Sequence, residues 1–405
     1  MAMMAIFLLL LLQRLFHHRN NRPPGPKPRP IIGNLNLIGA VPHLAFHALS
    51  KKYGPIMHLK LGFKDIVVAS SSDVAKAFLK THGFTFSSRP QTSAGKYTAY
   101  NYSSILWAPY GPHWRQARKI CNTKLFSHKS LESYEYIRKE EMKSILKKLF
   151  TSSGTTILLK DYLYTLSLNN ISRMALGKNG DSYVYRSFLF GEITIRARQG
   201  QFRKLLDEFS LLNTFVNIGD LIPWINFLDL QGYMKRMKDF SMKFDRFLEH
   251  VLDEHEEKRK RVENYVARDM MDVLLQLAED STFEVKLQRH TVKALTQAIG
   301  RDPTIWENPN MFFPERFIGK DIDVVGHHFE LLPFAIGRRI CPGYTLALKV
   351  VQSCLANLVH GFSWSLPNNM IEMDLNMKET FRLTNFKKLL LEAIIKPKLS
   401  SYLYF

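Results

Sequence analysis

The stretch "L-P-F-A-I-G-R-R-I-C-P-G-Y-T-L-A", Leu332 to Ala347, decides how the rest of the chain is interpreted. It places Cys341 between two glycines and near an arginine. Gly337 and Gly343 let the backbone approach a flat ligand or a sulfur atom closely, because neither carries a side chain. Arg339 supplies a cation suited to a carboxylate. A lone cysteine is usually a small buried apolar residue, but these neighbours favour a ligand.

The predicted helix after Cys341 strengthens this interpretation. It reads "Y-T-L-A-L-K-V-V-Q-S-C-L-A-N-L-V-H-G-F", begins near Gly343 and ends at Gly361. The dipole and free amides at its N-terminus favour thiolate over thiol. These are the needs of a thiolate that ligates haem iron axially and promotes O–O cleavage. Chance would produce the spacing F-x-x-G-x-R-x-C-x-G on the order of once in fifty thousand; here it is matched by Phe334, Gly337, Arg339, Cys341 and Gly343.

Composition bounds the class of protein. The 405 residues are 46% hydrophobic and 12% aromatic, which is typical of a globular chain. The net charge of +20 favours anionic surfaces, such as nucleic acid, lipid headgroups or an acidic protein partner. Three cysteines, Cys121, Cys341 and Cys354, imply no disulfide framework and fit a reducing, cytosol-facing location.

The N-terminus predicts a membrane anchor with a basic flank over residues 1–22. Met1 to Leu12 carries no charge, and Arg14, Arg19 and Arg22 follow it. Positive charge after an anchor places the following domain on the cytoplasmic side. The apolar run itself is shorter than the roughly 20 residues that cross a bilayer, and a frayed apolar tail is the alternative.

The remainder of the chain predicts a proline-rich hinge followed by one large domain. The hinge is "P-P-G-P-K-P-R-P-I-I-G-N", residues 23–34, whose prolines stiffen the backbone. Residues 35–405 then form a single domain, mainly α with small β-sheets. "I-M-H-L-K-L-G" and "I-V-V-A-S" predict two strands around Gly62 and Asp65.

One predicted helix carries both a core face and a charge run. Its apolar residues recur at helical spacing: Phe240, Phe244, Phe247, Leu248 and Val251. The run "D-E-H-E-E-K-R-K-R" that follows is expected to be a solvated helix end. His250 and His255 are five apart and do not share a helix face, so no histidine metal motif is expected from them.

In these motifs the chain resembles the cytochrome P-450 family, the haem-thiolate monooxygenases. Residues 23–34 resemble the microsomal hinge of that family, and "P-E-R-F", Pro314 to Phe317, resembles the segment before the haem loop. "W-R-Q-A-R", Trp114 to Arg118, resembles its W-x-x-x-R helix. "I-P-W-I-N-F-L-D-L-Q-G-Y" and "H-H-F-E-L-L-P-F" resemble the plant microsomal branch that modifies terpenoids and phenylpropanoids.

The resemblance implies a haem b cofactor with Cys341 as the axial thiolate. Trp114, Arg118 and Arg339 would hold the propionates, and Phe334, Gly337 and Gly343 would complete the cofactor-binding set. It also implies insertion of one oxygen atom from O₂ into a small lipophilic substrate, with electrons from an NADPH-dependent membrane reductase. The expected location is the endoplasmic reticulum membrane, facing the cytosol. Nucleic-acid binding is not expected, because the basic charge is dispersed and shows no zinc-finger or RNP-like pattern.

Two segments depart from the family or leave its role open. Ala335 and Ile336 stand where the family usually has small residues. A positive φ at Ile336 would cost roughly 1–3 kcal/mol. The aromatic loop Lys96 to Trp107 falls where the family covers its substrate, although a packed surface loop is as good a reading.

Two family motifs are missing. The oxygen-activating motif A-G-x-D/E-T does not occur, so no catalytic residue is identified. E-x-x-R occurs as Glu135 with Arg138, Glu256 with Arg259, and Glu379 with Arg382, and none stands where the clamp for Arg316 belongs.

Both missing motifs belong between Gln297 and Ala298. "T-V-K-A-L-T-Q" resembles the opening of the family's central helix, and "A-I-G-R-D-P-T-I-W-E-N-P" resembles the stretch beyond its E-x-x-R helix. We therefore expect an internal deletion at this seam, with the central helix cut short and the E-x-x-R helix absent. Two hypotheses follow: an active monooxygenase, or an inactive relic or splice product with weak or no haem binding.

Overall fold

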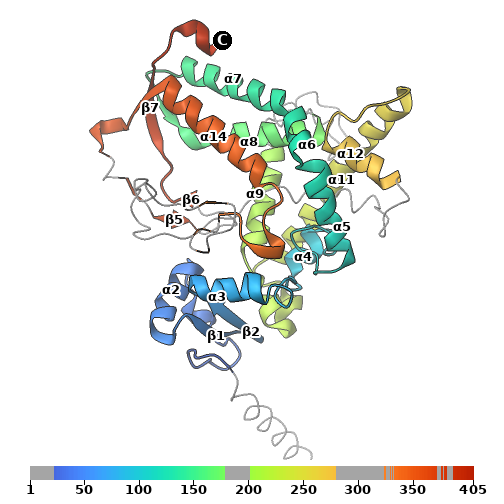
Figure 1. Ribbon diagram of the computed structural model, residues 1–405. Helices are drawn as coiled ribbons and strands as arrows, with labels where there is room; N and C mark the ends of the chain where they lie inside the picture. Colours follow the sequence, from blue (N-terminus) through green and yellow to red (C-terminus); the bar gives the residue numbers. More distant parts are fainter. Residues whose placement is uncertain are drawn as a thin grey trace, which may run out of the picture. The chain divides into compact units, whose positions relative to one another are not determined.

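The structure, a computed structural model, describes residues 22–177, 201–279, 323–324, 329, 331, 333–371, 375–376, 378–380 and 386–405. Over these residues the chain is mainly helical with small β-sheets, as predicted (Figure 1). It divides into two compact units. One contains the chain up to Gly83 together with Ile218–Leu230, and the other contains Phe84–Asn217 and Gln231–Phe405.

The first unit is built around a hairpin. Its helices and strands are α2 (Pro42–Tyr53), β1 (Ile56–Leu61), β2 (Lys64–Ala69), α3 (Ser72–Lys76) and α10 (Ile218–Leu221). Leu61 pairs with Lys64, so only Gly62 and Phe63 form the turn. Gly62 has a φ of +59°, which an L side chain rarely adopts. This antiparallel pair confirms the two strands predicted around Gly62 and Asp65.

The proline-rich segment is fastened to β1. The Asn34 Nδ2 atom donates to the carbonyls of Pro26 and Lys27, at 3.4 and 3.2 Å. The Asn34 Oδ1 atom accepts from the Lys60 backbone N–H at 2.9 Å. A Cβ atom on Gly33 would lie 2.0 Å from the Lys60 carbonyl oxygen, so only glycine permits this approach. The role of residues 23–34 as a hinge stays a prediction.

The second unit contains most of the helices and two of the sheets (Figure 1). Its first half comprises α4 (Ser93–Thr98), α5 (Pro112–Ile120), α6 (His128–Ser133), α7 (Glu135–Thr151), β3 (Thr156–Leu158), α8 (Leu159–Leu176) and α9 (Gln201–Thr214). Its second half comprises α11 (Tyr233–Arg261), α12 (Met270–Glu279), α14 (Tyr344–Gly361), β4 (Phe362–Ser365), β5 (Glu379–Thr380), β6 (Phe386–Lys387) and β7 (Glu392–Pro397).

Helix α11 supplies the larger core of this unit. The five predicted core residues, Phe240, Phe244, Phe247, Leu248 and Val251, are all buried. The charge run at its end is only partly solvated, however. His255 is 2% exposed, so the expectation of a solvated helix end is wrong at this residue. Helical spacing explains the difference, because His255 follows Val251 by four residues and shares its buried face.

A second core lies where α7 and α8 meet the sheet of order β3-β7-β4. Leu149, Leu166 and Phe362 are among its fully buried members. Helix α14 contributes Cys354 and Leu358 to this core and packs against α7. It begins directly after Gly343 and ends at Gly361, which confirms the predicted helix.

The aromatic loop packs within the second unit. Three consecutive residues, Tyr100, Asn101 and Tyr102, have φ values of 49°, 50° and 64°. The Trp107 Nε1 atom donates to Asn213 Oδ1 on α9 at 2.7 Å. Tyr97, Tyr100 and Trp107 lie against the larger core. These contacts describe a packed loop, and a contact with substrate stays a prediction.

Several predicted features lie outside the described residues. They are the apolar N-terminus, "P-E-R-F" with Arg316, Arg382 of the third E-x-x-R string, and the seam at Gln297 and Ala298. Among the helices that the structure describes, none combines the length and apolarity needed to cross a bilayer.

Candidate cofactor-binding site

The loop that carries Cys341 closes on itself ahead of α14. The Cys341 backbone N–H donates to the Phe334 carbonyl oxygen at 2.8 Å, and the Ile340 N–H donates to that of Gly337 at 3.2 Å. Gly337 has a φ of +76° and therefore needs to be glycine. The loop thus holds half-buried Cys341 two residues before the N-cap Gly343.

The strain expected in this loop falls on a different residue. Ile336 is extended, with φ −136° and ψ 164°, so the cost that a positive φ would have there does not arise. Ala335 carries the positive φ instead, at 57°. An alanine in the left-handed region costs roughly 1–2 kcal/mol, less than a β-branched residue would. Ile336 is buried, and its side chain contributes to packing.

Gly343 is not required by the protein itself. Its φ is −94°, and a Cβ atom there would only touch the Phe126 ring at 3.7 Å. Close approach of a ligand, the reason given from the sequence, stays a prediction. The Phe334 ring lies 6.2 Å from that of Tyr344, at the start of α14.

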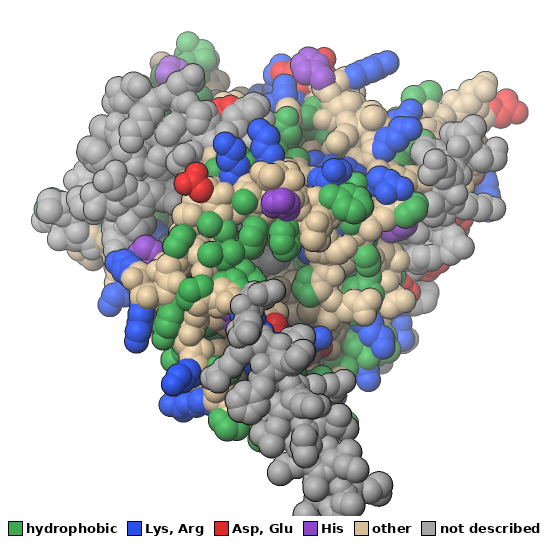
Figure 2. Space-filling view, turned by 60° about the horizontal axis from the view of Figure 1, so that its bottom comes forward, with side chains coloured by type: hydrophobic (Ala, Val, Ile, Leu, Met, Phe, Trp, Pro, Cys, Tyr) green, Lys and Arg blue, Asp and Glu red, His purple; other side chains and the backbone are tan. Residues whose placement is uncertain are grey.

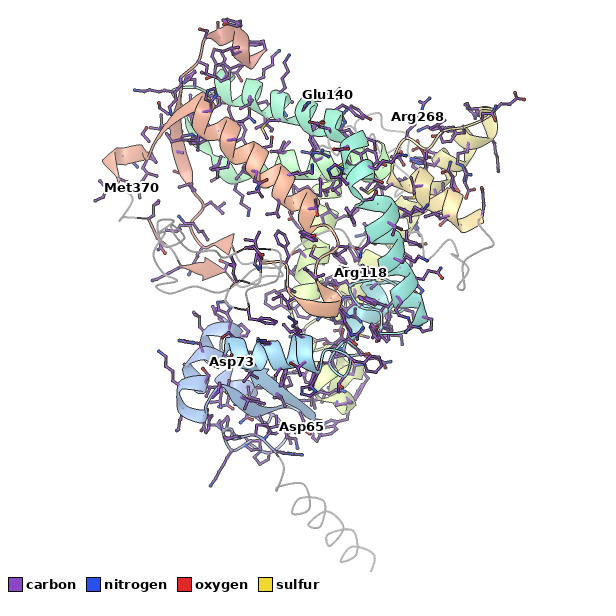
Figure 3. All side chains as sticks on the ribbon, in the orientation of Figure 1. Asp65, Asp73, Arg118, Glu140, Arg268 and Met370 are labelled. Carbon is purple, nitrogen blue, oxygen red and sulfur yellow. The ribbon has the colours of Figure 1, made fainter. Side chains whose placement is uncertain are left out.

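Helix α5 brings Arg118 to the cysteine loop. The Arg118 Nη1 atom donates to the Ile340 carbonyl oxygen, directly before Cys341. Arg118 lies where α5 ends, as Figure 3 shows. Burial lowers the pKa of Arg118 against the opposing influence of Cys121 and Cys341. The sequence-predicted pair of Arg118 and Cys341 is therefore brought together.

Arg339 is held by backbone carbonyls. Its guanidinium donates to the carbonyl oxygens of Ser87, Ile105 and Ala108, at 2.6, 3.2 and 2.5 Å. It also lies 4.7 Å from the ring centroid of Trp114. Burial, together with the charges of Arg89 and Arg118, lowers the pKa of Arg339 to about 10.

Trp114 supports Arg339 from α5. Its side chain is 4% exposed, and its Nε1 atom donates to the Ile105 carbonyl oxygen at 3.1 Å. Arg339 also bonds that carbonyl. The indole N–H therefore has a partner within the protein. A contact between Trp114 and a propionate stays a prediction.

The charges around this loop fit a ligand with carboxylates. Arg339 lies close enough to Arg89 and Arg118 to be repelled by both. Among the described residues, neither Arg118 nor Arg339 forms an ion pair with Asp or Glu, and their hydrogen bonds go to carbonyl oxygens. Half-buried cations without a counter-ion favour an anion. Haem carries two carboxylates, so the residues present fit this group on the side of its propionates and of its thiolate ligand.

Some residues of the site were missed from the sequence. The backbone carbonyls of Ser87, Ile105 and Ala108 could not be identified from the sequence, because every residue has a backbone carbonyl. Cys121 could have been found, since it follows Arg118 by three residues and shares its helical face. Burial raises the pKa of the Cys121 thiol to about 12. Cys121 is therefore a neutral neighbour of the loop.

In each of the two described E-x-x-R strings, one residue forms an ion pair outside its own string. Glu135 pairs with Lys139 at 3.1 Å on α7. Arg259 on α11 pairs with Glu279 on α12 at 2.7 Å. Glu379 lies in β5. Neither of these two ion pairs involves a residue of the Cys341 loop.

Comparison with known proteins identifies the class. The sequence profile of the family Cytochrome P450 matches residues 23–297 and 289–391. Trimethyltridecatetraene synthase of Zea mays is 34% identical over 507 aligned positions, which cover 95% of this chain and 90% of that protein. Flavonoid 3'-monooxygenase of Petunia hybrida is 31% identical, covering 98% of this chain and 97% of that protein. Flavonoid 3',5'-hydroxylase of Campanula medium is 31% identical, covering 95% and 93%.

The chain therefore belongs to the cytochrome P450 family, whose members bind haem through a thiolate. It is a P450-type oxidoreductase by resemblance, and its similarity to plant enzymes agrees with the branch predicted from the sequence.

The chain is shorter than these relatives by an internal segment. An alignment of 507 positions cannot be filled by 405 residues, although 95% of the chain takes part. The two matches to the family profile overlap at residues 289–297, beside the predicted seam at Gln297 and Ala298. The comparison thus agrees with an internal deletion.

Proposed function

We propose that this protein is a haem-thiolate monooxygenase that inserts one oxygen atom from O₂ into a small lipophilic metabolite of terpenoid or flavonoid type. The observation that carries the proposal is the Cys341 loop with its two arginines. Arg118 and Arg339 are half-buried beside the cysteine and have no carboxylate partner among the described residues. A cofactor that brings a sulfur-ligated metal and two carboxylates satisfies both features.

The roles of the residues follow from their contacts. Cys341 would be the axial ligand of a haem b, with Gly337 and Phe334 shaping the loop that presents it. Arg118 and Arg339 would bind the propionates, and Trp114 would keep Arg339 in place through ring stacking. When bound, a thiolate-ligated haem supplies the activation of O₂ that monooxygenation requires.

The substrate class is inferred from the relatives. Two of them are named for flavonoid oxidation and one for synthesis of trimethyltridecatetraene. All three names describe largely apolar organic compounds. A small lipophilic plant-type metabolite therefore fits this chain better than a charged substrate.

The partner and the location follow from charge and from the N-terminus. The net charge of +20 suits electrostatic steering of an acidic NADPH-dependent reductase. Lys and Arg side chains are spread widely over the face that Figure 2 shows. Residues 1–22 would anchor the protein in the endoplasmic reticulum membrane, residues 23–34 would form the hinge, and residues 35–405 would face the cytosol as the haem-binding domain.

A second candidate is an inactive relic or splice product. The absence from this chain of an internal segment that its relatives have favours this candidate. The family's oxygen-activating acid–threonine motif is absent from the sequence. A chain of this kind would keep the cysteine loop yet fail to turn over.

Carbon monoxide spectroscopy of the full chain tests haem binding. We expect the reduced, CO-treated protein to give a thiolate-type Soret band. Cys341→Ser should abolish this band, whereas the matched control Cys354→Ser on α14 should keep it. Absence of the band in the natural sequence would refute the proposal.

Turnover separates the two candidates. The protein is incubated with NADPH, a membrane reductase, isotopically labelled O₂ and a panel of terpenoids and flavonoids. Labelled oxygen in a product supports the monooxygenase. A thiolate-type spectrum without any labelled product supports the relic, and sequencing the transcript across the Gln297 codon then tells a splice product from a gene that lacks the exon.

A further inference from the structure

Three ionisable side chains gather in the interior of the second unit, where α8, α11 and α12 meet. They are His255 at the end of α11, Asp269 before α12 and Asp272 in its first turn. Their exposed fractions are 2%, 4% and 0%. One potential ligand atom from each lies within 4.8 Å of the others. Nothing in the proposed oxygen chemistry uses these residues.

The ring of His255 is oriented by the backbone. Its Nδ1 atom lies 2.7 Å from the Val251 carbonyl oxygen, and its Nε2 atom lies 2.9 Å from Asp269 Oδ2. A carbonyl oxygen can only accept, so Nδ1 carries the proton and donates it. Nε2 therefore points at the carboxylates. An imidazole that donates one N–H to a carbonyl and directs its other nitrogen inward is typical of a metal ligand.

Asp269 serves two purposes. Its Oδ1 atom accepts the Asp272 backbone N–H at 3.0 Å and so caps α12. Its Oδ2 atom remains for His255. The cap explains one oxygen of this carboxylate and leaves the other directed into the cluster.

Asp272 has an oxygen without a partner. Its Oδ2 atom accepts from the Tyr265 hydroxyl at 2.8 Å and from the Arg268 backbone N–H at 2.9 Å. Its Oδ1 atom is buried and has no hydrogen-bond partner among the described residues. A buried carboxylate oxygen with no donor is unfavourable, so this atom calls for a cation or a proton.

The end of α8 comes close to the cluster. Gly177 caps this helix with a φ of +67°. A Cβ atom on Gly177 would lie 2.5 Å from Asp269 Oδ2 and 3.9 Å from His255 Nε2. A side chain would therefore displace the carboxylate, and the glycine keeps this space for the three ligand residues.

The charges in the cluster do not balance. Two carboxylates face a single imidazole, and within the described residues neither Asp269 nor Asp272 forms an ion pair with a Lys or Arg side chain. Arg268 directly precedes Asp269 in the chain, and Figure 3 shows it beside α12. Its backbone N–H donates to Asp272 Oδ2. The cluster carries an excess of negative charge that a divalent cation would offset.

We propose that His255, Asp269 and Asp272 form a buried structural site for a divalent cation, with Zn²⁺ as the preferred ion. A nitrogen ligand with two carboxylates is a donor set that zinc accepts. The ligand atoms lie within 4.8 Å of one another. Tetrahedral zinc with bonds of about 2.0–2.2 Å would set them about 3.4 Å apart, so the side chains would close around the ion by up to about 1.4 Å. A fourth ligand would be water. The ion would tie the C-terminal part of α11 to the start of α12.

Metal analysis of the full chain, without a histidine tag, tests the proposal. The protein is supplied with Zn²⁺, passed through a desalting column, and its zinc is measured separately from haem iron. We expect about one zinc per chain with the natural sequence and at least a tenfold lower content with Asp272→Asn. His250→Gln, an exposed histidine on the same helix, should keep the zinc.

Thermal unfolding provides a second readout. Zn²⁺ should raise the melting temperature of the natural chain and of His250→Gln, and should leave that of Asp272→Asn unchanged. Asp272→Asn is nearly isosteric, so a folded variant is expected by circular dichroism; if it does not fold, Asp269→Asn replaces it. Zinc retained equally by the variant and the natural chain, or by neither, overturns the proposal. Neither outcome depends on the CO spectrum, so the proposed function stands or fails separately.

Discussion

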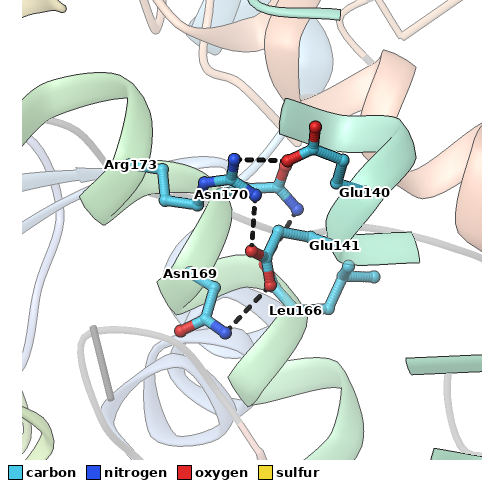
Figure 4. A network of polar contacts seen from close by, with 6 residues as sticks. All are labelled: Glu140, Glu141, Leu166, Asn169, Asn170 and Arg173. Atoms are coloured by element: carbon cyan, nitrogen blue, oxygen red, sulfur yellow. Dashed lines mark hydrogen bonds and ion pairs between the residues drawn. The ribbon is translucent and has the colours of Figure 1, made fainter. Parts of the chain in front are cut away.

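Two arginines of the second unit sit in opposite surroundings. On α8, Arg173 donates to Glu141 Oε1 at 2.8 Å and to Glu140 Oε2 at 2.5 Å, and Asn169 completes the network (Figure 4). Burial alone would lower the pKa of Arg173, but the hydrogen bonds to the two glutamates outweigh it and raise the pKa. Beside the cysteine loop, Arg339 has only carbonyl partners, and its pKa is lowered.

The difference is that Arg173 neutralises a buried carboxylate of the protein, whereas Arg339 neutralises none among the described residues. Glu141 is almost fully buried and would be left uncompensated without Arg173. Arg339 neutralises no buried carboxylate among the described residues, because all three of its acceptors are backbone carbonyl oxygens. The first arginine neutralises a buried carboxylate of the fold, and the second is one that we propose binds an anion.

The largest effect is expected at Arg173. Arg173→Ala should lower the free energy of unfolding by about 3–5 kcal/mol, because it leaves the buried Glu141 carboxylate without a partner. Urea unfolding followed by circular dichroism measures the change. Arg203→Ala removes an exposed pair with Asp161 and should cost no more than about 1 kcal/mol. Equal losses in both variants would contradict the comparison.

Arg339→Ala is expected to act on cofactor affinity as well as on stability. Loss of the guanidinium frees three carbonyls and should lower the free energy of unfolding by about 2 kcal/mol. Haem titration should show weaker binding. Arg339→Lys keeps the charge without the planar fork and should fall between Arg339→Ala and the natural chain. Haem affinity that is unchanged in both variants would remove the assigned role.

Arg118→Gln should lower haem affinity about tenfold, which equals about 1.4 kcal/mol. The charge near the propionates is lost, while glutamine can still donate to the Ile340 carbonyl. Haem titration measures the effect. Arg115→Gln changes an exposed arginine on the same helix and should leave the affinity as it is. A larger loss with Arg115→Gln would place the anion elsewhere.

The smallest effect is expected at Ala335. Ala335→Gly should raise the free energy of unfolding by about 0.5 kcal/mol, because relief of the left-handed strain exceeds the added freedom of the unfolded chain. Thermal unfolding measures the gain. Ala347→Gly, inside α14, should instead cost about 1 kcal/mol. A loss at Ala335 would show that the loop is not strained there.

Sequence patterns predicted the parts whose geometry repeats. The hairpin β1–β2, the buried face of α11 and the bounds of α14 follow from alternation, helical spacing and flanking glycines. The structure also brings Arg339 near Arg118, two residues that the resemblance assigns to one cofactor site. These predictions rest on side-chain types at fixed spacing.

The parts that could not be predicted depend on the backbone and on burial. No spacing rule says that three carbonyls would surround Arg339, or that Ala335 rather than Ile336 would adopt a positive φ. His255 was misjudged because a run of charges was treated as uniformly solvated. A helical wheel extended four residues beyond Val251 would have placed this histidine in the interior.

The attachment of Asn34 to β1 has a mechanical consequence. Asn34 receives the Lys60 N–H on its side chain and donates its own N–H to the Lys60 carbonyl at 2.5 Å. Its amide also grips Pro26 and Lys27. A pull on the chain ahead of Arg22 would therefore be resisted first by the hydrogen bonds that join residues 24–34 to one another and to β1.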